Sequence, residues 1–288
     1  MEITIAQIGL ALLLTTFAGL STGIGSFAAF FVKKESTRFL CLGLGFSAGV
    51  MIAVSFIELL NSSIESLGFI GGNLAFFIGI AVMFGLDKII PHEYIAEKLI
   101  NSETGEPMGE IHFHSHGPPE SSVASDLQTQ NSADKKKGLI KVGILTMFGI
   151  ALHNFPEGLV TFAGTLSSIS IGVILAIAIA AHNIPEGISV ALPIYAATEN
   201  RWQAFKLSFI SGVFEPIGAL VTAVVLLPFL NDFITGFLLA FVGGIMVYIS
   251  FDELIPASRE YGGKSELATL GVVIGMFFMV LTLILLRL

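Results

Sequence analysis

The sequence predicts an all-α polytopic membrane protein, and two observations carry this prediction. Hydrophobic residues make up 54% of the 288 positions, whereas charged residues make up 12%, about half of the charged fraction usual in soluble proteins. Apolar runs of about 18 residues or more recur along the whole chain, and a run of this length indicates a membrane-spanning helix. A chain of this composition is expected to place most of its helices in lipid.

Eight apolar runs meet this criterion, and we expect eight transmembrane helices in a single membrane domain. In chain order the runs cover residues 4–31, 38–61, 70–90, 139–164, 168–196, 202–227, 231–256 and 266–287. The first run is preceded by no positively charged segment, so we expect a retained helix rather than a cleaved signal peptide. Residues 1–91 would hold the first three helices, and residues 139–288 would hold the last five.

The long segment 92–138 separates these two groups of helices. It mixes Ser, Pro, Gly and Glu with a run of three lysines and has no periodicity, which is typical of a disordered loop. Within it, His112, His114 and His116 alternate along the tract HFHSH. In an extended chain these imidazoles would project to one side and could chelate a metal ion loosely. The alternative is a solvated loop that binds nothing.

Lysine and arginine predict the orientation, because they are retained on the cytoplasmic side of a membrane. If the N-terminus lies outside, every Lys and Arg except Arg287 falls on the cytoplasmic side, and the segment 92–138 is a cytoplasmic loop. Eight crossings return the C-terminus to the outside, so we expect both termini to be extracytoplasmic. The only cysteine, Cys41, excludes an intrachain disulfide.

Two segments of the second and seventh runs resemble each other. GVMIAVSFIEL at 49–59 and GIMVYISFDEL at 244–254 share Gly, Met, Ser, Phe, Glu and Leu at a constant offset of 195 positions. The predicted topology turns these runs in opposite directions, and inverted repeats are typical of transporters, whose binding sites lie near the membrane midplane. Chance similarity between glycine-rich apolar helices is the alternative.

A stronger repeat is the pair HNFPEG at His153–Gly158 and HNIPEG at His182–Gly187. The histidine and the glutamate of each copy are four residues apart and share one face of a helix, while the asparagine lies about 100° away on the same wheel. The proline frees a backbone carbonyl and should kink the helix, and the glycine lets another backbone come close. A helix–helix hydrogen bond plus a proline kink is the alternative, which the second copy disfavours.

Both motif glutamates fall near the middle of their runs, and Glu215 in the next run adds a third carboxylate, again followed by proline. An ionised group at the bilayer centre costs roughly 2.5–3.5 kcal/mol, and these runs offer no buried Lys or Arg to neutralise the carboxylates. Two divalent cations would neutralise them. Mixed nitrogen and oxygen ligands suit zinc, whereas an all-oxygen set suits the harder Fe²⁺ or Mn²⁺. The mixed set is His153, Glu157, His182 and Glu186, and the oxygen set is Asn154, Glu157, Asn183, Glu186 and Glu215, so that Glu157 and Glu186 would bridge the two.

Three further acidic residues occupy equivalent places in the other repeat. Glu58 lies in the second run, and Asp252 and Glu253 lie in the seventh. They could relay metal ions or protons to and from a central site. The alternative is that they lie near helix ends, in contact with water, and merely terminate the helix.

At these motifs the chain resembles the ZIP (Zrt-, Irt-like) family of metal transporters, in particular its bacterial zinc-uptake branch with a broad range of divalent metals. The resemblance covers essentially the whole chain, from the eight runs and extracytoplasmic termini to the long loop and the paired HNxPEG signatures. It implies a three-plus-two-plus-three helix arrangement with inverted symmetry in a bacterial plasma (inner) membrane. It also implies a binuclear metal site formed by the fourth to sixth helices, whose ligands map onto His153, Asn154, Glu157, His182, Asn183, Glu186 and Glu215.

The leading hypothesis is therefore a secondary transporter that admits Zn²⁺ to the cytoplasm, with Fe²⁺, Mn²⁺, Co²⁺ and Cd²⁺ as further substrates and no cofactor. No GxxxxGK[ST] motif is present, so the chain itself is not expected to hydrolyse ATP. An intramembrane metal-dependent hydrolase would need an open coordination position and a dedicated base, and a cation exporter of another fold fits the inverted repeat less well. The expected partners are metal ions and the bilayer, with no nucleic acid. GxxxG at Gly19–Gly23 and Gly45–Gly49 allows close helix packing within a chain or in a homodimer.

Overall fold

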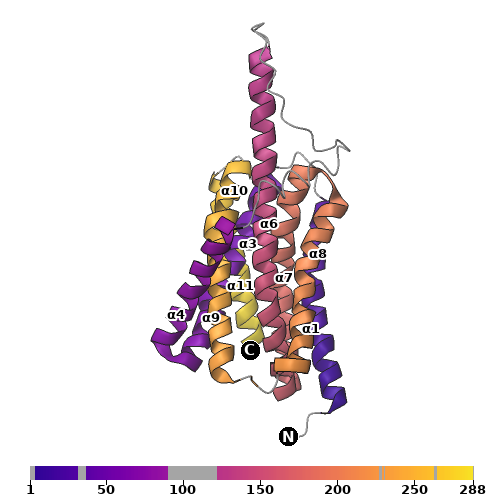
Figure 1. The fold of residues 1–288 in the computed structure, drawn as a ribbon, viewed down its shortest axis with the longest axis vertical. Helices are drawn as coiled ribbons and strands as arrows, with labels where there is room; N and C mark the ends of the chain where they lie inside the picture. Colours follow the sequence, from indigo (N-terminus) through magenta and orange to yellow (C-terminus); the bar gives the residue numbers. More distant parts are fainter. Residues whose placement is uncertain are drawn as a thin grey trace.

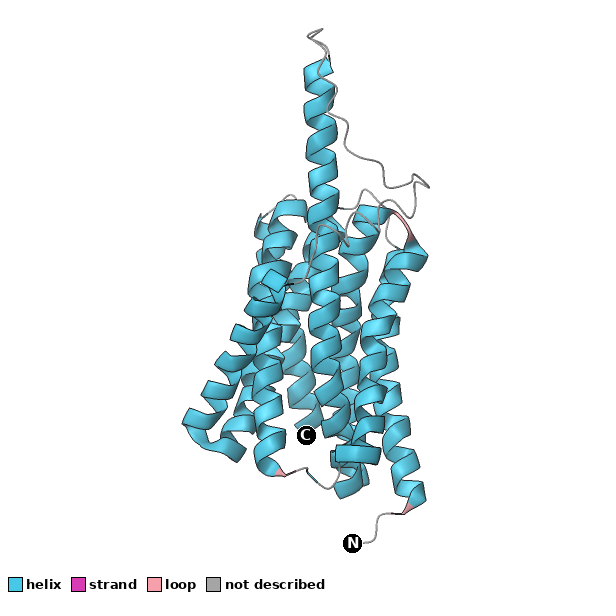
Figure 2. Ribbon diagram, in the orientation of Figure 1, coloured by secondary structure: helices cyan, strands magenta, loops and turns pink. Residues whose placement is uncertain are grey.

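The computed structural model describes residues 4–31, 37–89, 122–226, 229, 231–262 and 265–287. All regular structure within these residues is helical, and the helices form one elongated bundle (Figures 1 and 2). The long helices are α1 (Ile5–Ser26), α3 (Thr37–Val54), α4 (Leu60–Ile89), α6 (Ser122–Ser167), α7 (Ile169–Thr198), α8 (Arg201–Val221), α9 (Asp232–Ile249) and α11 (Ser265–Arg287). Short helices α2 (Ala28–Phe31) and α10 (Ile255–Gly262) and π-helical turns at Ser55–Leu59, Thr222–Leu226 and Ser250–Leu254 are also present.

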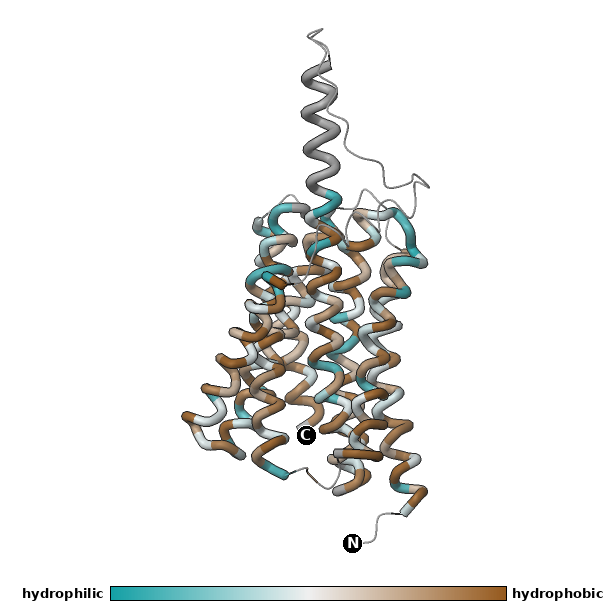
Figure 3. Tube along the Cα trace, viewed as in Figure 1, coloured by the Kyte–Doolittle hydropathy of each residue, from teal (hydrophilic) through white to brown (hydrophobic). Residues whose placement is uncertain are grey.

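Seven helical segments of the described chain are long and apolar enough to cross a membrane. They are Ile5–Phe31, Thr37–Ile89, Lys136–Leu166, Gly172–Thr198, Arg201–Val225, Asp232–Glu260 and Ser265–Leu286. Six of them match one predicted run each, whereas Thr37–Ile89 contains both the second and the third. Most positions of the bundle are hydrophobic (Figure 3), and many large apolar side chains are exposed, such as Phe77 at 62% and Phe277 at 67%, as expected for a surface that contacts lipid.

The segment Thr37–Ile89 is not a straight rod, because the chain reverses at Gly68. Gly68 has φ 72° and ψ 168°, a backbone conformation that glycine adopts far more readily than other residues. The ring centroids of Phe56 and Phe76 are 5.4 Å apart, although residues so distant in one continuous helix would be separated by about 30 Å. A Cβ atom added at Gly72 would also lie 2.9 Å from the Ile64 side chain. The predicted interruption between the second and third runs is therefore a helical hairpin around one glycine.

The helix α6 begins at Ser122, inside the segment predicted to be an irregular loop. It starts just after Pro118 and Pro119, and the sequence from there to position 138 contains no further proline and many good helix formers, such as Ala, Gln and Lys. Residues 122–138 are thus helical rather than irregular. Residues 90–121, which include the histidine tract, lie outside the described residues.

The repeat between the second and seventh runs is also present in the structure. Helices α3 and α9 both continue into a π-helical turn over the sequence SFxEL. Ser55 and Ser250 each donate their hydroxyl to the carbonyl oxygen four residues earlier, at 2.6 and 2.8 Å. The two turns carry Glu58 and Glu253 at equivalent positions, and π-helical turns of this kind are frequent at functional sites.

The helices pack in two groups. Helices α1, α6, α7 and α8 contact one another, while α3 packs against α11 and α4 packs against α9. Contacts of α3 with α7 and of α6 with α9 join the groups, and a large apolar cluster that includes Leu44, Leu145 and Ile245 fills the space between them. The beginning of α1 and the end of α11 lie toward the same end of the bundle (Figure 1).

Candidate metal centre

The seven predicted ligands come together in the interior of the bundle. Three lie on α6, three on α7 and one on α8: His153, Asn154, Glu157, His182, Asn183, Glu186 and Glu215. All of these side chains are buried, with exposed fractions between 0 and 4%. Hydrophilic positions accordingly interrupt the hydrophobic body of the bundle (Figure 3).

The histidine and glutamate of the two motifs pair between helices rather than within one helix. His153 Nε2 lies 3.0 Å from Glu186 Oε1, and His182 Nε2 lies 3.3 Å from Glu157 Oε1. Because the earlier residue of each motif faces the later residue of the other, α6 and α7 are antiparallel at this level. The four-residue spacing predicts a shared face, and the structure shows that this face of each helix is turned toward the other motif.

Both asparagines are held by backbone carbonyl groups of neighbouring helices. Asn154 Nδ2 donates to Ser211 O of α8 at 2.9 Å, and Asn183 Nδ2 donates to Ala18 O of α1 at 2.9 Å. Asn183 Nδ2 also donates to Glu215 Oε2 at 2.7 Å. Since the nitrogen is the only donor atom of an amide side chain, these bonds fix its orientation. Both Oδ1 atoms are left without a hydrogen-bond partner among the described residues and can serve as ligands.

The glycine that closes each motif lies directly against another backbone, as predicted. A Cβ atom at Gly158 would collide with the carbonyl oxygen of Glu215, and one at Gly187 would collide with that of Thr22. The motif helices α6 and α7 continue through their prolines. Close approach of α8 and α1 therefore brings their backbone and side chains to the edge of the centre.

The two GxxxG sequences also serve packing within the chain. Gly19 lies against Gly212 of α8, and Gly45 and Gly49 lie against the backbone of α11 at Ala268 and Val272. A hydrogen bond also joins α3 to α7, because Ser47 Oγ donates to the carbonyl oxygen of Pro185 at 2.6 Å. A homodimer would therefore need a contact surface other than these glycines.

The centre holds more negative than positive charge. Glu157, Glu186 and Glu215 are all buried, and Glu215 Oε1 has no hydrogen-bond partner among the described residues. A buried carboxylate is unfavourable unless it is paired, and two imidazoles can neutralise at most two of the three carboxylates. A divalent cation would remove the remaining charge.

In this conformation the described residues do not gather three His, Cys, Asp or Glu side chains around one point. The imidazole nitrogens and carboxylate oxygens that could bind a metal ion face each other instead, in the two ion pairs. A metal ion would have to replace these pairs. Metal binding and ion pairing are therefore alternative states of the same atoms.

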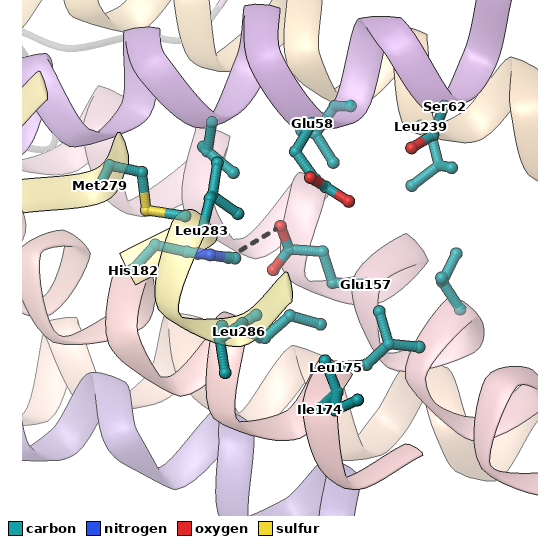
Figure 4. Close-up of a pocket in the computed structure, with 15 residues that line it drawn as sticks. Glu58, Ser62, Glu157, Ile174, Leu175, His182, Leu239, Met279, Leu283 and Leu286 are labelled. Atoms are coloured by element: carbon teal, nitrogen blue, oxygen red, sulfur yellow. Dashed lines mark ion pairs between the residues drawn. The ribbon is translucent and has the colours of Figure 1, made fainter. Parts of the chain in front are cut away.

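A cavity of about 270 Å³ leads to one of the two ion pairs (Figure 4). Residues of α3, α4, α6, α7, α9 and α11 and of the π-helical turn Ser55–Leu59 line it, and its wall is mostly apolar. The polar groups come from Glu58, Ser62, Glu157 and His182, and the carboxylates of Glu58 and Glu157 point into the same space (Figure 4). Of the three predicted relay residues, Glu58 thus lines the same cavity as Glu157 and His182.

The other two relay candidates belong to a separate polar cluster. The Tyr248 hydroxyl lies 3.0 Å from Asp252 Oδ2 and 3.3 Å from Asp87 Oδ2. Lys141 Nζ of α6 lies 3.6 Å from Asp87 Oδ1 and 4.0 Å from Glu253 Oε1. Sequence reasoning missed Tyr248 and Lys141 as members of this cluster. The four-residue spacing of Tyr248 and Asp252 was the available signal for the tyrosine.

Comparison with known proteins agrees with the motifs and the fold. A family model described as ZIP zinc transporter matches residues 4–283 of the chain. The zinc transporter ZupT of Clostridium perfringens is 45% identical over 96% of this chain and 95% of its own length. The proteins of the same name from Campylobacter jejuni and Chlorobium phaeovibrioides are 43% and 46% identical, with at least 96% of either chain covered.

A match to the family model over nearly the whole chain, supported by relatives that align over almost their full length, establishes the family. Members of this family and the similar relatives are zinc transporters, so the protein is a transporter and not an enzyme. The metal-dependent hydrolase considered above is therefore excluded. The chain belongs to the ZIP zinc transporter family of multi-pass membrane proteins.

Proposed function

We propose that the protein is a secondary transporter that takes up zinc into the cytoplasm through the buried centre formed by α6, α7 and α8. The observation that carries this proposal is the cavity beside Glu157 and His182, whose other lining residues lie toward one end of the bundle. Under the charge-based topology that end is extracytoplasmic, because the cavity is lined by the later parts of α6 and α11 and by the first half of α7. A cation can therefore approach the centre from outside the cell.

The proposed topology has eight crossings in a three-plus-two-plus-three arrangement with inverted repeats. Thr37–Ile89 supplies two of them because it reverses at Gly68, and each of the other six apolar segments supplies one. An even number of crossings agrees with α1 beginning and α11 ending toward the same end of the bundle (Figure 1). The distribution of Lys and Arg favours the extracytoplasmic side for both termini. The relatives are bacterial, so we place the protein in a bacterial plasma membrane.

The centre is proposed to hold two metal ions at once. Glu157 and Glu186 would bridge them, the imidazoles of His153 and His182 would bind one ion, and Glu215 with the two amide oxygens would bind the other. The unpartnered Oδ1 atoms and Glu215 Oε1 support this assignment, because hard oxygen ligands and borderline imidazoles prefer different ions. Two divalent cations also bring enough charge to balance three carboxylates.

The same mixed ligand set supports a broader range of substrates than zinc alone. Fe²⁺ and Mn²⁺ accept oxygen-rich coordination, and Co²⁺ and Cd²⁺ accept imidazole together with carboxylate. We therefore include these four ions among the proposed substrates. Since the sequence has no phosphate-binding GxxxxGK[ST] motif, the driving force would come from ion gradients rather than from ATP.

Metal accumulation in cells that express the protein tests this proposal. Expression of the intact chain should raise cellular zinc, whereas Glu186→Gln, made at the same membrane abundance, should not. Lower cellular zinc would indicate export, and unchanged zinc would contradict transport in either direction. Purified protein in vesicles that contain a zinc-sensitive dye would then show whether Fe²⁺, Mn²⁺, Co²⁺ and Cd²⁺ compete with zinc, and whether an imposed pH gradient changes the rate.

A further inference from the structure

The contacts around the centre repeat under an approximate two-fold relation that exchanges α6 with α7 and α1 with α8. On one side Asn154 donates to the carbonyl of Ser211, and on the other Asn183 donates to the carbonyl of Ala18. Asn183 follows Asn154 by 29 positions, and Ser211 follows Ala18 by 193 positions. Gly158 lies against the carbonyl oxygen of Glu215, and Gly187 lies against that of Thr22. These two contacts are related by the same offsets of 29 and 193 positions.

Thr22 is the counterpart of Glu215 in this relation, because the same 193 positions separate them. A Cβ atom at Gly19 would lie 3.0 Å from Glu215 Cβ, and one at Gly212 would lie 2.8 Å from Thr22 Cβ. The two side chains therefore leave their helices in equivalent directions. Glu215 is bonded to Asn183, so the equivalent neighbour of Thr22 is the asparagine of the first motif.

The hydroxyl of Thr22 lacks the local partner that most buried threonines of the described chain have, as does that of Thr146. Buried threonines of this protein commonly donate to the carbonyl oxygen four residues earlier, as Thr15, Thr161 and Thr222 do at 2.7–2.9 Å, which is the usual local partner of a helical threonine. Thr22 is also fully buried, yet its Oγ1 has no hydrogen-bond partner among the described residues. A buried hydroxyl left without a partner is costly, so its lone pairs are available to a ligand of the centre.

We propose that Thr22 is a specificity-determining residue of the metal centre, where it supplies a neutral hydroxyl oxygen at the place that mirrors the Glu215 carboxylate. This inference rests on the transport function proposed above. It makes the centre asymmetric in charge, with an anionic side at Asn183 and Glu215 and a neutral side at Asn154 and Thr22. The cation of the oxygen-rich site therefore lies nearer to Glu215 than to Thr22, and it is held by one carboxylate fewer than a symmetric site would supply.

Because position 22 holds a threonine where the mirrored position 215 holds a glutamate, the centre has three carboxylates rather than four. This difference also affects the release of the metal ions. Three carboxylates and two divalent cations leave an excess of positive charge, whereas four carboxylates would neutralise both cations. Transport requires that an ion binds well enough to enter and weakly enough to leave. A threonine at position 22 therefore favours turnover over affinity.

Uptake by proteoliposomes tests the role of the hydroxyl. Thr22→Val keeps the shape of the side chain but removes the oxygen, so the apparent KM for zinc should rise about ten-fold, the size usual for loss of a group that supports a metal site. Thr22→Ser should keep the wild-type KM. Thr15→Val, on the same helix, is the matched control, because Thr15 bonds only its own helix. Equal kinetics of Thr22→Val and Thr15→Val would overturn the proposal.

Moving the carboxylate between the two mirrored positions is a sharper test. Glu215→Thr alone should lower the uptake of zinc and, to a larger extent, that of Fe²⁺. The double variant T22E/E215T should recover most of this loss, and T15E/E215T should recover none. Thr22→Glu alone should bind zinc more tightly and transport it more slowly. Zinc binding by calorimetry and monodisperse elution in detergent confirm that each variant is folded. No recovery in a folded T22E/E215T would overturn the inference.

The two hypotheses fail in different ways. If the wild-type protein moves no metal into vesicles, the proposed function is wrong. If the wild type transports and Glu215→Thr transports less, while all Thr22 variants behave like their Thr15 controls, the function stands and the role of Thr22 is wrong.

Discussion

At the scale of single residues, the chemistry of the centre depends on which atoms already have partners. The nitrogen of each motif asparagine is bound to a backbone carbonyl, and each motif carboxylate faces an imidazole. The amide oxygens and Glu215 Oε1 have no such partner among the described residues. A substitution at a bridging carboxylate should therefore affect every substrate, whereas a substitution at a peripheral ligand should affect some more than others.

The first prediction concerns the two carboxylates that we propose to bridge the metal ions. Glu157→Ala or Glu186→Ala should abolish uptake of every metal, because each removes a ligand of both proposed sites and leaves an imidazole without its partner. Uptake of Zn²⁺, Fe²⁺ and Mn²⁺ into cells, corrected for membrane expression, is the measurement. Glu65→Ala, at an exposed position of α4, should transport normally. Near wild-type zinc uptake by either motif variant would show that the bridging assignment is wrong.

The second prediction concerns metal choice. Asn154→Ala or Glu215→Ala should weaken Fe²⁺ or Mn²⁺ uptake more than Zn²⁺ uptake, because zinc keeps its imidazole ligands. His182→Ala should do the reverse, since a hard cation loses less when a nitrogen ligand is removed. Competition between two metals in one uptake assay measures the ratio directly. An equal loss of all metals in each variant would mean that the two proposed sites act as one unit.

The sequence was sufficient to select the candidate ligands that the structure brings together, but it did not show which groups those side chains contact. Buried carboxylates in apolar runs, repeated with the same spacing, indicate a cation site because few other arrangements pay for their burial. The spacing says which face of α6 carries His153 and Glu157, but it does not say which helix that face meets. The bonds of Asn183 to Ala18 and the place of Thr22 join parts of the chain more than 150 positions apart, so only the folded structure shows them.

At the scale of the helix, glycine sets how close the elements come. Gly158 of α6 lies against α8 and Gly187 of α7 lies against α1, each with a carbonyl oxygen where a Cβ atom would be. Backbone atoms cannot move aside as a flexible side chain can. A methyl group at either position must therefore push a whole helix outward.

The third prediction tests this packing. Gly187→Ala should destabilise the protein by at least about 1–3 kcal/mol, the range typical of overpacking, and should lower the temperature at which it loses monodisperse elution in detergent. Gly85→Ala in α4 is the control, because no atom lies within 4 Å of the added Cβ. It should be neutral or stabilising by up to about 1 kcal/mol, from helix propensity. Equal thermal shifts for the two variants would contradict the packing argument.

Helix positions were predictable from hydropathy, whereas two boundaries were not. The interruption around Gly68 is visible as a polar stretch, but the sharp reversal depends on one glycine with positive φ. The start of α6 lies in a polar segment without an apolar face, so periodicity says nothing there, and the position of two prolines was the better guide.

At the scale of the whole molecule, the proposed uptake depends on orientation in the membrane. The cavity at Glu58 and the cluster at Asp252 and Lys141 are separate, and the charge-based topology puts the first outside and the second inside. Reversing the topology would place the cavity on the cytoplasmic side instead.

The fourth prediction tests the orientation. Alkaline phosphatase fused after the C-terminus should be active, and a fluorescent protein fused there should be dark, because both results report an extracytoplasmic end. The same reporters fused after Asn200, between α7 and α8, should give the opposite pattern. A fluorescent C-terminal fusion would require an odd number of crossings or an inverted protein.

The meeting of Gly19 and Gly212 determines how wide the centre is. A Cβ atom on Gly19 would lie 2.7 Å from the carbonyl oxygen of Gly212, and one on Gly212 would lie 2.5 Å from that of Gly19, so the backbones of α1 and α8 are in direct contact at this point. Such atoms have no rotamers, and the contact acts as a spacer of fixed thickness between Thr22 and Glu215. Calcium takes six to eight oxygen ligands and avoids nitrogen, whereas zinc is satisfied by about four ligands that include imidazole. A frame that cannot widen to admit further oxygen ligands therefore disfavours abundant calcium, even though both ions carry the same charge.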